Sequence, residues 1–164
     1  MVLPSHQELL RVNALRRAGG KTLELERRET TLHRRCSCDH WLAVYGTLGP
    51  GRENHAVLAD IGGSWRDGFF VEGVFSPHGW GTTSGFPAFK WISANTPVAE
   101  PERSGRAKLP VVRLSVWVLH ATDLPRHWAR LDEFEGEEYR RVLVPVVNAA
   151  GETVLIANLY EAAG

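Results

Sequence analysis

The sequence predicts an α+β fold, in which a curved mixed sheet or a small barrel has helices alongside it. Several segments have the alternation or the apolar runs of β-strands, whereas few have a helical period. The chain has 164 residues and is 43% hydrophobic, which suffices for one domain with a sizeable core plus an extension. No segment repeats another.

Residues 1–40 are interpreted as an N-terminal helical and irregular extension, and residues 41–164 as the domain. Ser5 and Glu8 have the spacing of a capping box, and apolar residues after them predict a short helix that ends at the glycine pair 19–20. The rest of the extension is polar and has no clear period. The extension carries eight Lys or Arg against five Asp or Glu, and the domain eleven against fourteen. We therefore expect a solvated tail that is dispensable for the core fold; docking on the acidic domain or on an acidic partner is the alternative.

Six segments of the domain have strand patterns and two have helical ones. The clearest strand alternates apolar and other residues from 112 to 118. The expected strands are 41–45, 68–75, 88–92, 112–119, 139–147 and 153–160. A short helix is expected over 53–61, and a longer one begins at Thr122 or Asp123 and ends at Gly136.

Glu135 continues the apolar stripe of the longer helix. Leu124, Trp128 and Leu131 lie four and then three residues apart, on one face. Glu135 follows Leu124 by eleven residues, which returns a helix to nearly the same face. We expect its carboxyl to face the body of the protein, where desolvation and the helix dipole raise its pKa and suit it to act as a general base. The alternative is a solvated acidic helix end.

A second candidate segment is the strand end Tyr45-Gly46-Thr47-Leu48. Apolar strand residues lead directly into a turn that contains glycine. Such a turn presents consecutive backbone N–H groups to one point, which suits a carboxylate or a phosphate. An ordinary strand-to-loop turn is the alternative interpretation.

Composition argues against several classes of protein. The formal net charge is zero, which is unlike a nucleic-acid binder. No signal peptide opens the chain, and no run of about 18 apolar residues occurs, so we expect no membrane partner. Two cysteines only one residue apart indicate a reducing, cytoplasmic setting.

A metal site near those cysteines was considered. The segment Cys36-Ser37-Cys38-Asp39-His40, with His33 nearby, has residue types that bind metals. No second pair of ligands follows at the spacing of a structural zinc site, so no metal is predicted.

The order of the segments resembles the gamma-glutamylcyclotransferase family, in particular its gamma-glutamylamine cyclotransferase and AIG2-like branch. The resemblance covers residues 41–161. The matching residues are Tyr45-Gly46-Thr47-Leu48, Asn54-His55 with Leu58, Gly85-Phe86-Pro87-Ala88, Leu131-Asp132-Glu133-Phe134-Glu135-Gly136 with Tyr139, and Ala157-Asn158-Leu159-Tyr160. Residues 114–117 depart from it, since the family often has Gly-Glu-Leu-Tyr there and this chain has Leu-Ser-Val-Trp.

The resemblance implies a small mixed β-barrel with flanking helices and a small-molecule γ-glutamyl substrate. Glu135 would transfer protons while the γ-glutamyl group cyclises to 5-oxoproline and an amine is released, with no cofactor and no metal. A non-catalytic binding module and a different acyl-amide chemistry on the same fold are the alternatives. The implied substrate-binding residues are Tyr45, Gly46, Thr47, Leu48 and Tyr139.

Overall fold

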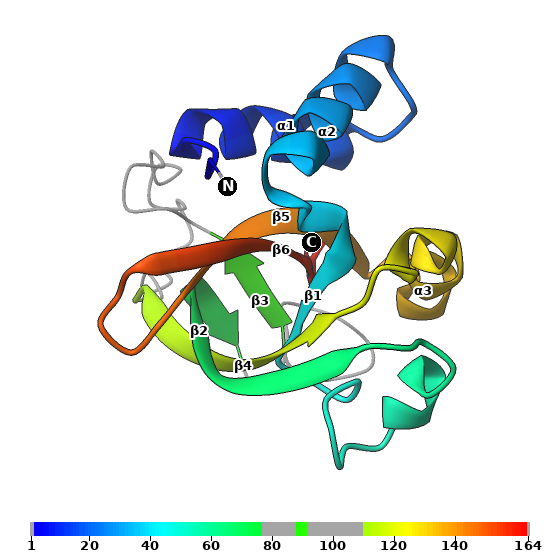
Figure 1. Cartoon of the computed structure of the whole chain (residues 1–164), viewed down its shortest axis with the longest axis vertical. Helices are drawn as coiled ribbons and strands as arrows, with labels where there is room; N and C mark the ends of the chain where they lie inside the picture. The colour runs from blue at the N-terminus through cyan, green and yellow to red at the C-terminus, as the bar shows by residue number, and fades with distance from the viewer. Residues whose placement is uncertain (1, 77–87, 92–109, 164) are drawn as a thin grey trace, which may run out of the picture.

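Six strands form one mixed sheet that closes into a five-stranded barrel (Figure 1). The computed structural model describes residues 2–76, 88–91 and 110–163. The strand order is β3-β2-β4-β1-β6-β5; a further pairing of β2 with β5 closes the barrel and leaves β3 as an extra strand on β2. Only β1 and β6 pair in parallel in the described sheet. The strands are β1 (Trp41–Val44), β2 (Ser64–Ser76), β3 (Ala88–Trp91), β4 (Val112–His120), β5 (Tyr139–Val147) and β6 (Thr153–Ala162). The α+β barrel with flanking helices is therefore confirmed.

The helices differ more from the expectation than the strands do. The expected helix up to Gly136 is split, because residues 124–127 close tighter i→i+3 bonds: the His127 amide donates to the Leu124 carbonyl at 2.8 Å. Neither Thr122 nor Asp123 caps this α-helix. The Asp123 side chain makes no capping hydrogen bond to the short 3-10 turn that follows it, and the α-helix begins only at Trp128. The helices are α1 (His6–Ala18), α2 (Leu23–Cys36) and α3 (Trp128–Glu135), with short 3-10 turns η1 (Cys38–His40), η2 (His55–Leu58) and η3 (Leu124–Arg126).

Helix α2 was missed in the polar segment after residue 20. Thr22 caps it, because its hydroxyl accepts a hydrogen bond from the Leu25 amide at 3.1 Å. Its buried side chains are Leu25, Leu32 and Cys36. This stripe is sparse and stands among charged residues, so no period was evident in the sequence.

Two further expectations are changed or left aside. Strand β2 begins at Ser64, and Gly68, at φ 81°, lies where its pairing with β4 shifts register between Arg66 and Phe69. A glycine that was interpreted as the strand start is thus part of a bulge. The family match at 85–87 lies outside the described residues.

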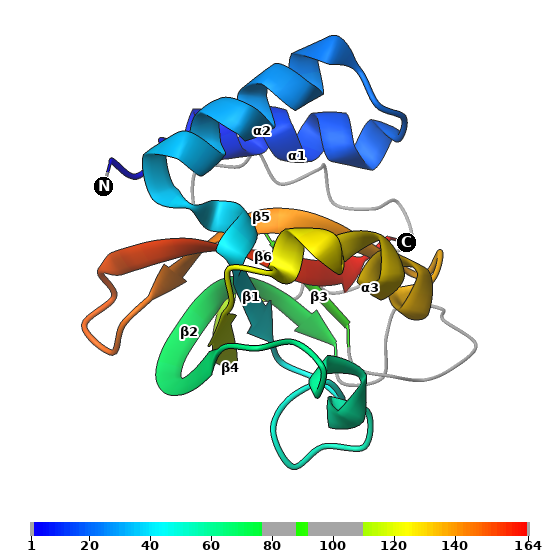
Figure 2. The same cartoon turned by 45° about the vertical axis from the view of Figure 1, so that its right-hand side comes forward.

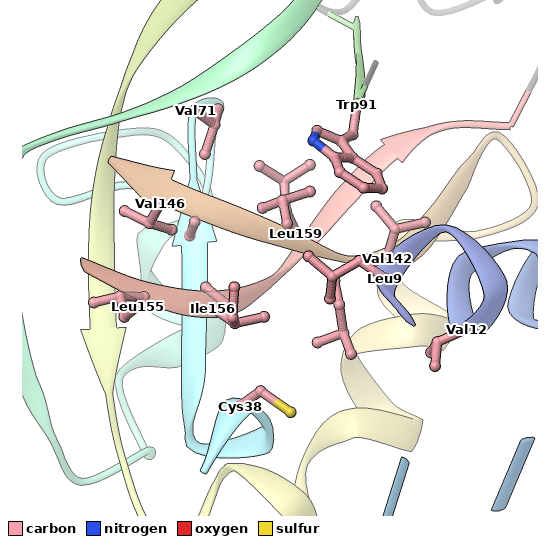
Figure 3. Packing of buried hydrophobic residues seen from close by; sticks show 14 of the residues in the cluster. Leu9, Val12, Cys38, Val71, Trp91, Val142, Val146, Leu155, Ile156 and Leu159 are labelled. Carbon is pink, nitrogen blue, oxygen red and sulfur yellow. The ribbon is translucent and has the colours of Figure 1, made fainter. Parts of the chain in front are cut away.

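The N-terminal helices share the main core with the barrel. Figure 2 shows α1 and α2 lying over β5 and β6. Leu9 and Val12 of α1 pack near Val142, Ile156 and Leu159 of these strands, as Figure 3 shows. The division at residue 40 remains a prediction, but the packing gives no support to a dispensable tail. No helix in the described ranges has the length and apolarity to cross a membrane.

Asn13 joins α1 to the barrel through two buried hydrogen bonds. Its side-chain amide donates to the Leu143 carbonyl at 2.8 Å and accepts from the Leu143 amide at 2.8 Å. Leu143 pairs with Asn158 of β6 on one side, and β2 pairs with β5 only at Val147 among the described residues. The N–H and C=O of Leu143 therefore meet Asn13 on its other side, where no strand lies beside it. Asn13 therefore caps an edge of the sheet.

We expect Asn13→Ala to lower the free energy of unfolding by about 2–4 kcal/mol, since it leaves a buried N–H and a buried C=O without partners. Urea unfolding measures this. Gln7→Ala is the matched control, because Gln7 is exposed on the same helix and should change little. An equal, small effect of both substitutions would contradict the structural role of Asn13.

Candidate active site

A cavity of about 210 Å³ opens where the end of β1 meets the end of α3. Strands β5 and β6 contribute its remaining wall. All six residues predicted for the site line this cavity, although they come from distant parts of the sequence. The lining residues are Ala43, Val44, Tyr45, Gly46, Thr47, Leu48, Asn54, Phe134, Glu135, Glu138, Tyr139 and Tyr160.

Hydrogen bonds to its carbonyl groups fix the loop after β1. The Gly49 amide donates to the Gly46 carbonyl at 3.2 Å, and the Asn54 amide donates to the Thr47 carbonyl at 2.9 Å. The Asn54 side chain adds a 2.9 Å bond to the Thr47 hydroxyl. The amides of residues 46–48, in contrast, donate to no group in the described part of the chain. They are therefore available to bind an anion.

Two residues of this loop, Gly46 and Leu48, border the cavity through their backbone and not through a side chain. Leu48 is buried in the core at 4% exposure, so its contribution is its backbone. A Cβ placed on Gly46 would meet no atom within 4 Å, which shows that this glycine borders open space.

Glu135 is the last residue of α3 and is half-buried against the cavity. Leu124, Trp128 and Leu131, which precede it on the same stripe, are buried. Burial raises the pKa of the Glu135 carboxyl to about 7. The nearby Glu133 is exposed. A carboxyl with this pKa exchanges its proton near neutral pH, as a general acid–base group must.

Three tyrosines surround this carboxyl. The Tyr45 hydroxyl donates to the Tyr160 carbonyl at 2.8 Å, and the Tyr160 hydroxyl donates to Asp132 at 2.6 Å. Burial is the main cause that raises the pKa of Tyr45, Tyr139 and Tyr160, and the negative charge of Glu135 raises the pKa of each further. These phenols therefore stay protonated and form a neutral wall.

Six of the lining residues were not assigned roles from the sequence, and two of these make hydrogen bonds that shape the site. Tyr160 closes the cavity and orients Tyr45, and Asn54 fixes the loop at Thr47. Both lie in segments that carry the family resemblance, which was the available signal. Among the described lining residues none is His or Cys, so the cavity wall offers a metal ion only the carboxylates of Glu135 and Glu138.

A family model described as "Gamma-glutamyl cyclotransferase, AIG2-like" matches residues 42–164. The chain belongs to this family. Membership indicates cyclotransferase-type activity, and the family acts on small γ-glutamyl substrates. No curated protein matches the chain.

Solved structures of limited identity resemble this AIG2-like chain. YkqA of Bacillus subtilis is 23% identical with a TM-score of 0.46, and the alignment covers 75% of this chain and 35% of YkqA. The chain thus spans about a third of the length of YkqA. An AIG2-like protein of Mus musculus is 17% identical with a TM-score of 0.46, over 74% of this chain and 76% of the mouse protein. An uncharacterized protein of Pyrococcus horikoshii is 21% identical with a TM-score of 0.36, over 76% and 78%.

The raised pKa of Glu135 predicts a pH-dependent stability for this AIG2-like protein. Between the ordinary pKa of 4.5 and about 7 the folded protein holds a proton that the unfolded chain releases. Stability from this group is thus fully present below about pH 4.5 and is lost as pH rises through about 7. We expect Glu135→Gln to exceed the parent by about 2–3 kcal/mol in unfolding free energy at pH 8 and to match it at pH 4. Urea unfolding at both pH values measures this. Exposed Glu133→Gln should show no such difference, and a pH-independent effect of Glu135→Gln would contradict the burial.

Proposed function

We propose that the chain is a cyclotransferase that converts a γ-glutamyl amine, amino acid or peptide into 5-oxoproline and a free amine. Glu135 is its general acid–base residue. One observation carries the proposal: the Glu135 carboxyl, whose pKa is raised to about 7, and the amides of residues 46–48 border the same cavity.

The loop amides bind the α-carboxylate of the γ-glutamyl group. This places the α-amino nitrogen and the γ-carbonyl of one molecule together, and their reaction is intramolecular, so positioning supplies much of the acceleration. Tyr45 and Tyr139 form neutral walls beside the substrate, which suits the uncharged γ-carbonyl and the amine once it has lost its proton.

Glu135 accounts for the proton transfers. The ionised carboxylate takes a proton from the α-ammonium, and the freed amine attacks the γ-carbonyl to form a tetrahedral intermediate. Glu135 then returns its proton to the departing nitrogen as the old amide bond breaks. The second proton of the ring nitrogen passes to the released amine, which leaves as an ammonium, so each turnover restores the starting state of Glu135. A pKa of about 7 lets it serve both steps near neutral pH.

The decisive experiment incubates the purified chain with a panel of γ-glutamyl amines, amino acids and peptides and measures 5-oxoproline together with the released amine. We expect equal amounts of the two products from at least one compound. Release of free glutamate instead would indicate a different acyl-amide chemistry. Binding of a γ-glutamyl compound without any turnover would indicate a non-catalytic binding module.

A small molecule is thus the proposed partner, and neither nucleic acid nor membrane enters the reaction. We propose a cytoplasmic location for the protein. The free thiols of Cys36 and Cys38 support this, because disulfides are rare in that compartment.

Gly46→Val is expected to abolish binding of the substrate with little loss of stability. The Cβ of the new side chain meets no protein atom within 4 Å, so the side chain starts in open space beside the cavity and takes volume that the ligand needs. Calorimetric titration with a γ-glutamyl ligand and thermal melting measure the two effects. Gly62→Val is the matched control, because its Cβ would also meet no atom within 4 Å and Gly62 lies outside the lining residues. Equal ligand binding by Gly46→Val and the parent would remove the loop from the site.

A further inference from the structure

His33, Asp39 and His40 gather at the junction between α2 and the barrel. His33 lies in the last turn of α2, and the other two lie in η1, which follows one residue later. Ser37 separates these elements in a left-handed conformation, at φ 52°, and so turns the chain back on the helix end. One ligand atom from each of the three side chains lies within 4.8 Å of the others.

Two of the facing atoms of this cluster contact each other directly. His33 Nδ1 faces Asp39 Oδ1 in an ion pair, and both atoms are shielded from solvent and form no well-directed hydrogen bond within the described residues. His40 Nε2 lies 3.9 Å from the same carboxylate oxygen. The two imidazole rings are 5.0 Å apart, nearly edge to face. Two nitrogen donors and one oxygen donor thus point toward a shared space.

The backbone that carries these side chains is fixed from outside the cluster. The Trp128 indole donates to the Asp39 carbonyl at 3.2 Å, and the Ala121 amide donates to the His40 carbonyl at 2.9 Å. The His120 ring packs against His40 at 6.3 Å between centroids. Ligands mounted in this way need little rearrangement to close on an ion.

We infer that His33, Asp39 and His40 bind one divalent transition-metal ion of the zinc class, with solvent completing its coordination. Imidazole nitrogens with one carboxylate suit Zn²⁺, whereas Ca²⁺ and Mg²⁺ prefer oxygen ligands throughout. In tetrahedral geometry ligand atoms at about 2.1 Å from zinc lie about 3.4 Å from each other. To reach this spacing His33 and Asp39 rotate apart and His40 moves slightly closer to Asp39. The three side chains are 37%, 31% and 23% exposed, so the cluster lies near the surface, and separation of His33 Nδ1 from Asp39 Oδ1 opens it to an ion and a water ligand.

The cysteines beside this cluster are not part of it. Cys36 and Cys38 are buried within the main core, where Figure 3 shows Cys38. The site therefore keeps His33, Asp39 and His40 of the segment considered in the sequence and leaves out its two cysteines. It precedes the first residue of β1, whereas the cavity with Glu135 lies beyond the last residue of that strand. The ion joins α2 to η1 and takes no part in the proposed reaction.

The test uses the full chain without an affinity tag, stripped of metal with a chelator that is then removed. Calorimetric titration with Zn²⁺ is expected to give one equivalent bound, and Co²⁺ is expected to give the visible absorption of a low-coordinate site. Zinc at about 100 times its dissociation constant should raise the melting temperature by roughly 5–10 °C. His33→Gln, Asp39→Asn and His40→Gln should each weaken zinc binding at least about tenfold.

Matched controls separate the site from incidental binding. His6→Gln and Asp67→Asn remove the same groups elsewhere and should bind zinc as the parent does. If the parent takes up no zinc, or if the three cluster variants bind it as tightly as the controls, the site does not exist. A third outcome is that zinc does not stabilise the parent and that Asp39→Asn loses the same stability with and without zinc. This would show that the cluster is a direct His33–Asp39 ion pair and not a metal site. None of these readouts depends on 5-oxoproline formation.

Discussion

Glu135→Gln is expected to lower the turnover of 5-oxoproline formation by roughly 10²–10⁴-fold, the usual contribution of general acid–base catalysis. Glutamine keeps the size of the side chain and much of its hydrogen bonding, but it accepts no proton from the substrate ammonium. Ligand binding should persist, because the loop amides of residues 46–48 that bind the carboxylate are unchanged. Steady-state kinetics with the best substrate of the panel, together with calorimetric binding, measure the two effects separately.

Glu133→Gln and Glu137→Gln are the controls for this prediction. Both side chains are exposed, whereas Glu135 is half-buried at the cavity. Each control should retain parental turnover to within a small factor. Turnover by Glu135→Gln equal to that of the parent would show that this carboxyl does not transfer the proton, even if the chain is an active cyclotransferase.

The strands were predictable because a buried strand has a short run of apolar or alternating residues in the sequence. Strand β5 has the bounds expected from its apolar run, Tyr139–Val147. The strand order was not predictable, since pairs such as Leu42 with Asn158 join segments more than a hundred residues apart. Local periodicity holds no information about such partners, and the resemblance to a known family supplied the barrel.

The candidate site likewise has residues that were predictable from the sequence and residues that were not. Glu135 and the loop of residues 45–48 each follow from a short local pattern. Tyr160 acquires its place only when its carbonyl meets the Tyr45 hydroxyl at 2.8 Å across the barrel. Helix α2 was missed for a different reason, because only Leu25, Leu32 and Cys36 are buried on its inner face and six polar residues separate the first two.

Deletion of residues 1–37 is expected to leave a chain that does not fold cooperatively. The deleted helices contain four buried aliphatic side chains: Leu9, Val12, Leu25 and Leu32. Burial of each contributes about 1.5–3 kcal/mol, so their combined loss, roughly 6–12 kcal/mol, is comparable with the total stability of a typical domain, about 5–15 kcal/mol. The deletion also exposes the apolar barrel surface that these helices cover.

Polar contacts add to the cost of this deletion. Arg17 pairs at 2.7 Å with Glu161, which is 3% exposed and also accepts a hydrogen bond from the Trp91 amide at 3.0 Å. Without Arg17 a buried carboxylate loses its countercharge, which is strongly destabilising. Circular dichroism in the near ultraviolet and thermal melting measure the outcome, and we expect a molten or insoluble product.

A paired comparison within α2 tests the same packing without a deletion. Leu25 is 7% exposed, so Leu25→Ala should lower the free energy of unfolding by about 2–5 kcal/mol, whereas Leu23 is 61% exposed and Leu23→Ala should lower it little. A fragment from residue 38 onward that melts as sharply as the whole chain would restore the interpretation of residues 1–40 as a dispensable tail.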